Sequence, residues 1–286
     1  MTNKTISIII PSFNQGEFIE RTILSVISQN CNNYELIVID GGSTDVTLEI
    51  LKKYESYFSH CIIEKDSGQS EAINKGFKIA KGEFVTWLNS DDLLLPNVLS
   101  ELSSKINNKP SIKLFFGNTV WMNSNDQIIQ IRKGESYKSI FSKQGFFHSY
   151  GPSAFFHKSL LYEYGFLRED FHYMMDTEFW FRLNKNAINF YRLNSFCWAL
   201  RLHEKAKMSG HNFSNSELAN LDHPSFKIKE QEREMISQLY QFPNHNTGKL
   251  YRIFYFLHKW SSIRVLYWFS MSYFLKGKNI KTIYGK

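Results

Sequence analysis

Four short apolar runs, rich in β-branched residues, alternate with amphipathic segments along the first hundred residues. The runs cover residues 6–10, 36–39, 61–63 and 84–88. Runs of this kind predict strands buried on both faces, as in a parallel sheet. Between the runs, apolar residues recur at every third or fourth position, which predicts helices. Repeated strand–helix units of this length predict an α/β fold with a mostly parallel sheet and helices on both faces.

Polar residues, glycine and proline indicate where these helices begin and end. Asp45 is suited to N-cap the helix after the second strand. Gly82 is suited to end the following helix as its C′ residue, and Pro96 to open the helix after the fourth strand.

The alternation weakens beyond about residue 113. Apolar runs at 114–116 and 128–131 predict further strands, whereas 145–175 is rich in Gly, aromatic residues and His and is expected to be loop. A short helix is expected at 176–183 and a polar, charge-alternating helix at 215–240. No internal repeat is present in the sequence.

The composition is that of a globular protein with a large core. Of 286 residues, 43% are hydrophobic and 16% aromatic, which excludes a disordered chain. The net charge of +7 is unevenly distributed, because residues 249–286 hold eight basic and no acidic side chains. The other 248 residues hold 26 basic and 27 acidic side chains, so the body is near neutral. A nucleic-acid partner is therefore disfavoured.

Cysteine usage and hydropathy bear on the cellular compartment. The three cysteines include no CxxC pair, which disfavours a disulfide framework and a cysteine-based zinc site. The first residues lack the apolar core of a signal peptide, and no stretch of 18 uncharged apolar residues occurs. We therefore expect a cytoplasmic protein without a plain transmembrane helix.

Polar side chains follow all four predicted strands of the first hundred residues. They are Asn14, Asp40, Asp66, and the pair Asp91 and Asp92. Ligands of open α/β sheets bind at the carboxyl ends of the strands, where these residues are expected. Each residue taken singly is equally well explained as turn chemistry, but four successive strand ends favour a binding site.

Several motifs of other α/β proteins are absent. The sequence has no GxGxxG after the first strand, no GxxxxGK[ST] and no GxSxG. These absences disfavour a Rossmann dehydrogenase, a P-loop protein and an α/β-hydrolase. An acidic edge with hydroxyl groups suits a nucleotide ribose and a hard divalent cation such as Mg²⁺ or Mn²⁺.

The motifs of this region together resemble the opening of family 2 glycosyltransferases. The matching segments, in order, are residues 7–14, 25–29, 35–45, 72–76, 81–83 and 87–92. The resemblance extends to about residue 210. It implies the GT-A fold, which has a Rossmann-like, mostly parallel sheet, together with a nucleotide-sugar donor and an inverting transfer.

The resemblance also implies roles for residues at the strand ends. Pro11, Ser12 and Asn14 would line the nucleotide pocket. Asp40 would bind the uracil or the ribose of a UDP-sugar. Asp66 would make another contact with the nucleotide or the donor sugar.

The segment from Asn89 to Asp92 occupies the position of the family's metal motif. Asn89 stands where a strict DxD motif has its first aspartate, so the choice between Asp91 and Asp92 as direct ligand of Mn²⁺ or Mg²⁺ stays open. In similar enzymes a late histidine faces the metal or the diphosphate, which implies this role for His203. Lys207 would neutralise the phosphates.

A catalytic base is expected at the start of the predicted helix at 176–183. In an inverting transfer the acceptor hydroxyl loses its proton as it attacks the anomeric carbon, and a positioned carboxylate accepts that proton. The resemblance assigns this role to Asp176, with Glu178 as the reserve candidate. The alternative is that Asp176 only caps the helix. His148, in a loop that resembles the one before the acceptor site, is a weak candidate for an acceptor or donor-sugar contact.

Residues 250–275 hold ten aromatic side chains among three cations. Such a segment suits the interface of an anionic membrane. A helical hairpin that packs on the body or on a second subunit explains the composition too, and the latter would make a homo-oligomer. Single-stranded nucleic acid also suits aromatic and basic residues, but the near-neutral body does not support it.

The expected organisation follows from these assignments. Residues 1–212 form the GT-A domain, with a nucleotide-binding half at 1–112 and an acceptor-side half at 113–212. Residues 213–286 form a helical extension, with a linker near 243–246.

The sequence therefore predicts a metal-dependent, inverting glycosyltransferase. It would move a sugar, most simply from a UDP-sugar, to a glycan or lipid-linked acceptor of a bacterial surface polysaccharide at the inner face of the membrane. Two alternatives stay open. A nucleotidyltransferase would normally carry a basic residue in a Gly-rich loop after the first strand, and residues 11–16 contain none. A non-catalytic scaffold would have no need of Asp91, Asp92 and Asp176.

Overall fold

The computed structural model describes residues 6–134, 154–186, 188–207, 224–240 and 271–283. Three sequence predictions concern residues outside these ranges. They are the role of His148, the linker near 243–246 and most of the basic, aromatic tail.

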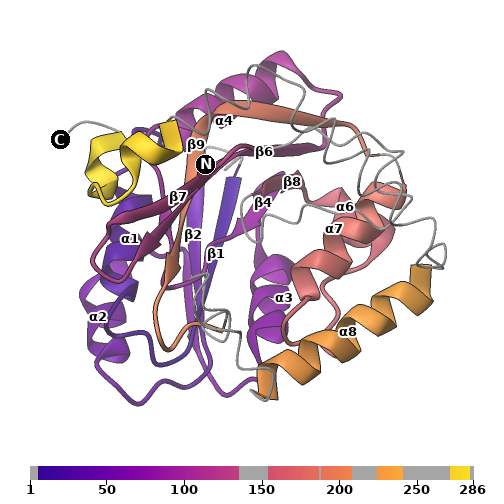
Figure 1. Ribbon diagram of the computed structural model, residues 1–286, viewed down its shortest axis with the longest axis horizontal. Coiled ribbons are helices and arrows are strands. Elements are labelled where there is room, and N and C mark those ends of the chain that lie inside the picture. Colours follow the sequence, from indigo (N-terminus) through magenta and orange to yellow (C-terminus); the bar gives the residue numbers. More distant parts are fainter. Residues whose placement is uncertain (1–5, 135–153, 187, 208–223, 241–270, 284–286) are drawn as a thin grey trace.

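The first half of the chain forms the parallel part of a single sheet (Figure 1). Its strands are β1 (Ile6–Ser12), β2 (Tyr34–Asp40), β3 (His60–Ile63) and β4 (Phe84–Trp87). They lie side by side in the order β3-β2-β1-β4 and are all parallel. In this register Ser12 pairs with Asp40, so the polar ends of β1 and β2 lie at the same edge of the sheet.

Helices cover both faces of the sheet, as the strand–helix alternation predicts (Figure 1). The helices of the first half are α1 (Ile19–Ile27), α2 (Thr47–Lys53), η1 (Glu55–Tyr57), α3 (Gln69–Ile79) and α4 (Val98–Asn108). Ile8 and Ile10 of β1 belong to the core cluster that α1, α2 and α4 share. Ile9, which points to the opposite face, packs with Ile73 and Phe77 of α3. Successive side chains of β1 point to opposite faces of the sheet, so the strand contributes residues to the hydrophobic core on each face.

The second half extends the sheet with mainly antiparallel pairs. Its strands are β5 (Leu93–Leu94), β6 (Leu114–Asn123), β7 (Ile128–Arg132), β8 (Ala154–His157) and β9 (Phe190–Leu202). The described strands follow the order β3-β2-β1-β4-β8-β6-β9-β5, with β7 paired to β6. β8 is antiparallel to both β4 and β6, whereas β6 and β9 are parallel. The antiparallel pairs are an addition to the predicted parallel sheet.

The stretch at 145–175 is not all loop, contrary to the sequence prediction. It contains β8 and the short helix α6 (Ser159–Tyr164), and α7 (Met175–Lys185) begins at its end. Phe155, Phe156, Leu160 and Leu161 are fully buried in the two core clusters. Phe155 and Phe156, two of the aromatic residues that suggested an irregular segment, are core residues.

Two of the predicted helix boundaries need correction. α3 ends at Ile79 with Ala80 as its C-cap, so Gly82 is not the C′ residue. Gly82 lies instead against β1, where a Cβ atom would come within 2.6 Å of the Ser7 Oγ. The glycine is required by this close approach of two backbones rather than by a left-handed conformation. After β4, α4 begins only at Val98, two residues beyond Pro96.

Asp45 lies close to its predicted capping role. Its Oδ1 accepts a hydrogen bond from the backbone N–H of Thr47 at 3.0 Å, although the residue at the N-cap position of α2 is Val46. Its Oδ2 accepts from the N–H of Gly16 at 3.1 Å. Asp45 therefore also ties the loop after β1 to the start of α2.

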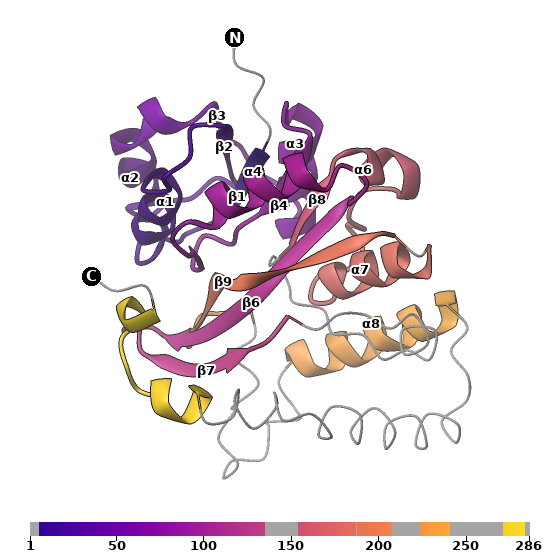
Figure 2. The same ribbon diagram turned by 90° about the horizontal axis from the view of Figure 1, so that it is seen from above.

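The C-terminal elements pack on the body of the protein (Figure 2). α8 (Pro224–Tyr240) runs beside α7, and its Ile236 belongs to the core cluster of α3 and α7. Residues 271–275 are helical, and η2 (Ile280–Ile283) follows. Leu275 and Ile280 are buried in the cluster beneath β6 and β7, and the N–H of Ile128 donates to the carbonyl of Lys278 at 2.7 Å. The described end of the tail thus docks on the body, as in the hairpin alternative.

No helix among the described residues is long and apolar enough to cross a bilayer.

Candidate active site

A cavity of about 920 Å³ opens at the carboxyl ends of the parallel strands. Its walls come from β1, β4, the start of α3, the start of α7, the end of β9 and α8. The lining residues among the predicted site residues are Pro11, Ser12, Asp66, Asn89, Asp91, Asp92, Asp176 and Lys207. The fold therefore brings together side chains that are up to about 200 positions apart in the sequence.

Asp40 and Asn14 organise the loops beside this cavity but do not line it. The Asp40 carboxylate is fully buried and accepts from the Ser43 N–H at 2.7 Å and the Ser43 hydroxyl at 2.7 Å. It also accepts from the N–H of Gly42, whose φ of +85° favours glycine. Asn14 accepts from the N–H of Thr44 at 2.8 Å, so both side chains hold the turn after β2. A direct contact of either residue with a nucleotide stays a prediction.

Ser12 belongs to the cavity wall. Its side chain is buried, and the Oγ has no hydrogen-bond partner among the described residues. Buried hydroxyl groups are normally paired. Because the Oγ is closed off from solvent, a contact of Ser12 with a nucleotide stays a prediction.

Asp66 lines the same side of the cavity. Its Oδ1 accepts from the N–H of Gly68 at 2.9 Å, and partial burial raises the pKa of its carboxyl group. A Cβ atom on Gly41 would come within 2.9 Å of the Asp66 Oδ2, so the glycine after β2 makes room for this carboxylate. Asp66 thus lies where the loops after β2 and β3 meet.

Asn89 and Asp92 form a partly buried chain of hydrogen bonds at the end of β4. Gln69 donates to Asn89 at 2.8 Å, and Asn89 donates to the Oδ2 of Asp92 at 2.9 Å. The Oδ1 of Asp92 accepts from the backbone N–H of Arg201 at 2.8 Å. Burial, followed by the charge of Asp91, raises the pKa of Asp92 well above its ordinary value. Asp92 therefore braces β9 against the loop after β4.

Asp91 lines the cavity and contacts His203, which does not line it. The Oδ2 of Asp91 lies 3.0 Å from the Nε2 of His203, whose ring packs 4.4 Å from the ring of Phe18. Two ligands at about 2.1 Å from one octahedral ion, at right angles, are about 3 Å apart. The side chains of Asp91 and His203 form a hydrogen bond or ion pair, and the same 3.0 Å is also the spacing of two neighbouring ligands of one ion. No cluster of three or more His, Cys, Asp or Glu side chains suited to a metal occurs within the described ranges.

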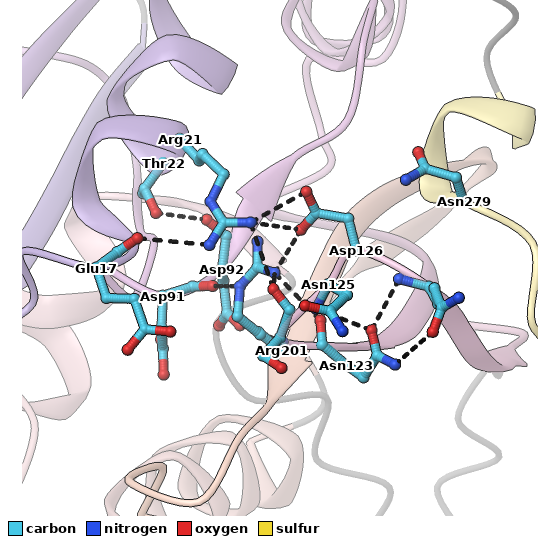
Figure 3. A network of polar contacts seen from close by, with 12 residues as sticks. Glu17, Arg21, Thr22, Asp91, Asp92, Asn123, Asn125, Asp126, Arg201 and Asn279 are labelled. Atoms are coloured by element: carbon cyan, nitrogen blue, oxygen red, sulfur yellow. Dashed lines mark hydrogen bonds and ion pairs between the residues drawn. The ribbon is translucent and has the colours of Figure 1, made fainter.

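Arg201 was not predicted as a site residue, yet it holds the acidic loop in place (Figure 3). Its side chain is completely buried and lines the cavity. The Nε donates to the carbonyl of Asp91 at 2.8 Å, and the guanidinium forms an ion pair with Asp126 in the turn between β6 and β7. Arg21 reaches the same carboxylate at 3.1 Å. One buried arginine thus links the loop after β4 to a hairpin more than 30 residues further along the chain.

Asp176 lies in the first turn of α7 and lines the cavity. Its Oδ1 accepts from the N–H of Thr177 at 2.6 Å. The residue at the N-cap position of α7 is Met174, so Asp176 is not the N-cap of this helix. Its carboxylate nevertheless accepts a backbone N–H of the first turn, so the capping alternative stays open beside the catalytic one.

Glu178 points away from the cavity. The residue is 1% exposed. It accepts from Arg182 at 2.8 and 3.1 Å and from the hydroxyl of Tyr240 at 2.6 Å. Glu178 does not line the cavity. Because its oxygens are committed to this buried network, the structure does not support it as the reserve base.

Lysines of the segment after β9 and of α8 also line the cavity. Lys207 donates to the carbonyl of His172 at 2.8 Å, and partial removal from water lowers its pKa. Lys229 of α8 lies 5.5 Å from the centre of the Tyr173 ring and has its pKa lowered for the same reason. Arg233 follows Lys229 by four positions and lines the cavity too. This i, i+4 spacing is visible in the sequence, but nothing local shows that this face of α8 meets the site.

The family profile described as Glycosyl transferase family 2 matches residues 7–165, which is more than half of the chain. The chain belongs to glycosyl transferase family 2. This confirms the resemblance read from the strand-end motifs.

Curated relatives are bacterial glycosyltransferases. The poly(ribitol-phosphate) beta-N-acetylglucosaminyltransferase TarP of Staphylococcus aureus is 42% identical over 104 residues, which cover 35% of this chain and 32% of TarP. The putative teichuronic acid biosynthesis glycosyltransferase TuaG of Bacillus subtilis is 40% identical over 97 residues, or 32% of this chain and 38% of TuaG. A PGL/p-HBAD biosynthesis glycosyltransferase of Mycobacterium bovis is 28% identical over 159 residues, or 51% and 62% of the two chains. The chain thus spans between about one third and three fifths of the length of these relatives.

Solved structures of S. aureus TarS share the fold. The complex of TarS residues 1–349 with UDP-GlcNAc has a TM-score of 0.55 and 20% identity, and the match covers 73% of this chain and 62% of that chain. The complex with UDP has the same TM-score and covers 86% and 75%. The predicted GT-A fold is therefore confirmed, whereas the identity is too low to carry ligand contacts across.

Proposed function

We propose that the protein transfers a sugar from a UDP-sugar to an acceptor hydroxyl in the synthesis of a bacterial cell-wall polysaccharide, with inversion at the anomeric carbon. The observation that carries this proposal is that Asp91 and Asp176 line one cavity at the carboxyl ends of the parallel strands. In the proposed arrangement Asp91 is on the side of the diphosphate and Asp176 on the side of the acceptor.

The proposed reaction is a single displacement. The oxygen of the acceptor hydroxyl forms a bond to the anomeric carbon while the bond from that carbon to the diphosphate oxygen breaks. Asp176 accepts the proton of the hydroxyl. Lys207, in the same cavity wall, is suited to offset the negative charge that develops on the departing UDP.

A divalent cation fits the residues at the end of β4. Asp91 and His203 would hold Mn²⁺ or Mg²⁺, since an oxygen and an imidazole nitrogen 3.0 Å apart suit such an ion and phosphates commonly complete its coordination. Asp92 is the weaker ligand candidate, because its oxygens already accept from Arg201 and Asn89. When bound, the cation would stabilise the charge of the diphosphate.

UDP-N-acetylglucosamine is the first donor to test. TarP is named as an N-acetylglucosaminyltransferase and TarS was solved with UDP-GlcNAc. A polyol-phosphate polymer is the first acceptor to test, because TarP is named for poly(ribitol phosphate). The cations Lys205, Lys207, Lys229 and Arg233 in the cavity wall suit a substrate with phosphate groups.

We also propose that the enzyme works at an anionic membrane surface through its basic, aromatic tail. In the described part of this tail, Tyr273 is 86% and Phe274 66% exposed, and the Lys278 Nζ lies 3.3 Å from the centre of the Phe274 ring. Exposed aromatic rings beside lysines suit the interface between water and lipid. Replacing both rings by serine is expected to reduce sedimentation with anionic liposomes. Unchanged sedimentation would favour packing against a second subunit.

The decisive experiment measures UDP release from UDP-N-acetylglucosamine with Mn²⁺ and poly(ribitol phosphate), followed by analysis of the anomeric linkage in the product. A product with inverted configuration supports the proposal. A retained configuration, or release of pyrophosphate in place of UDP, would refute it. A thermal-shift screen against other nucleotide sugars identifies the donor if this one does not bind.

A further inference from the structure

α8 lies outside the segment that the family profile matches, yet it forms part of the cavity wall. The most buried acidic residue on this helix is Glu232, which is 3% exposed. A buried carboxylate is costly unless it is paired or hydrogen-bonded. The hydrogen-bond partners of Glu232 therefore indicate the role of this buried carboxylate.

The carboxylate of Glu232 accepts hydrogen bonds from three successive backbone N–H groups. The N–H of His172 donates to Oε1 at 2.6 Å, and that of Met174 donates to Oε2 at 2.7 Å. The N–H of Tyr173, between them, lies 3.2 Å from Oε1 and 3.0 Å from Oε2. Successive N–H groups that converge in this way form a concavity suited to an anion. Here the anion is a side chain from another helix, about 60 residues away in the sequence.

These three residues come directly before α7, and Asp176 is the second residue of that helix. His172, Tyr173 and Met174 line the cavity together with Asp176. The main chain directly before the proposed base is consequently fixed by hydrogen bonds to one buried carboxylate, that of Glu232. The positive end of the α7 dipole lies at the same place and favours a negative group there.

We propose that Glu232 is a positioning residue for Asp176, and this rests on the proposed function of Asp176 as the base. Glu232 does not line the cavity and takes no part in the proton transfer. It acts by fixing the main chain at 172–174, and so the distance and direction from the Asp176 carboxylate to the acceptor hydroxyl.

The test is Glu232→Gln with Glu234→Gln as its matched control. Glutamine has the shape of glutamate but offers one carbonyl oxygen and one NH₂ group, so at least one of the three N–H groups faces another donor. Glu234 lies on the same helix, is exposed, and does not line the cavity. The control therefore removes the same charge from α8 without disturbing these hydrogen bonds.

The first readout is amide hydrogen exchange in a peptide spanning residues 171–177. Glu232→Gln should accelerate exchange there, whereas Glu234→Gln should leave it unchanged. Equal exchange in the two variants would overturn the proposal. This readout does not depend on activity, so it judges the anchoring separately from the proposed function, which fails if the wild type releases no UDP from any nucleotide sugar that it binds.

The second readout is UDP release from UDP-N-acetylglucosamine with poly(ribitol phosphate) as acceptor. Misplacing a reacting group by about 1 Å can cost on the order of 100-fold in rate. Glu232→Gln should therefore lower kcat roughly 10- to 100-fold, with UDP affinity within about threefold of wild type. A kcat within twofold of wild type would overturn the positioning role.

A double-mutant comparison separates positioning from general damage. If Glu232 acts through Asp176, adding Glu232→Gln to Asp176→Asn should change the residual rate by less than about twofold, because the group being positioned is already disabled. The same large loss in both backgrounds would overturn the proposal. If Glu232→Gln does not fold, Glu232→Asp, which keeps the charge and shortens the side chain, is examined with the same readouts and the same criteria.

Discussion

Replacing Asp126 by asparagine tests the buried ion pair that supports the acidic loop (Figure 3). Asp126 pairs with Arg201, whose side chain is 0% exposed, and with Arg21, whose side chain is 37% exposed. The substitution keeps the shape of the side chain and removes its charge. Arg201 would keep the carbonyl oxygens of Asp91, Asn123 and Ser124 as acceptors.

The size of the effect follows from the burial of the two partners. Removing one partner of a buried ion pair costs about 3–5 kcal/mol, since the other charge stays buried. Asp126 is 24% exposed and asparagine still offers an oxygen, so we expect a loss at or below the lower end of that range. A loss of about 2–3 kcal/mol corresponds to a fall in Tm of roughly 3–5 °C for a chain of this size, because the entropy of unfolding is about 2.1 cal/mol/K per residue.

The assay is thermal unfolding of Asp126→Asn, with Arg21→Gln as the control. Arg21 contacts the same carboxylate from the surface, where an ion pair contributes about 0–1 kcal/mol. The control should therefore lower Tm by no more than about 2 °C. Because Arg201 also binds Asp91 and Asp92 through its Nε and backbone N–H, Asp126→Asn should weaken UDP binding in Mn²⁺ as well. Equal shifts in the two variants, or a shift below about 1 °C in Asp126→Asn, would refute this account of the network.

Three further predictions concern the site and the tail. Asp176→Asn should lower transfer by about 10²–10⁴-fold while calorimetry finds UDP affinity within a few-fold of wild type; substantial remaining transfer would move the base to another residue. UDP should bind more tightly with Mn²⁺ than with EDTA, and Asp91→Ala should abolish the difference; equal affinities in the wild type would exclude the metal role. Ile280→Ala should cost about 2–5 kcal/mol, because this residue is 2% exposed in the core beneath β6 and β7; a Tm unchanged from wild type would mean that the tail end does not pack there.

The cavity is lined by both kinds of charge. Its carboxylates come from the loops after β3 and β4 and from the start of α7, and its cations come from β7, β9, the segment after β9 and α8. A body that is near neutral overall therefore presents charged groups of both signs in one cavity.

The parallel half of the sheet was predictable because its signal is local. Each strand is a short apolar run with a polar residue at its end, and in the observed register Ser12 and Asp40 lie side by side. Strand β8 was missed for the opposite reason. Ala154 to His157 reads as part of an aromatic loop, and only its pairing with β4 and β6 makes it a central strand.

The sequence predicted which residues lie near the site. It did not predict which of their side chains point into the cavity. Asp40 and Asp66 both lie at the ends of strands. The carboxylate of Asp40 binds the N–H of Ser43 in the turn after β2, whereas Asp66 lines the cavity. Asp176 and Glu178 are two positions apart on α7, which points them to different sides of the helix. Glu178 therefore binds Arg182 inside the protein while Asp176 lines the cavity.

The sequence by itself determined the family, the parallel half of the sheet and the candidates for base and metal ligand, because periodicity and strand-end motifs are properties of neighbouring residues. Only the tertiary structure decided which distant residues support them. Asp126 is 75 positions from Arg201, and Glu232 is about 60 from the backbone that it holds. A buried charge must find a partner, but many side chains in the sequence would satisfy it, and packing alone selects one.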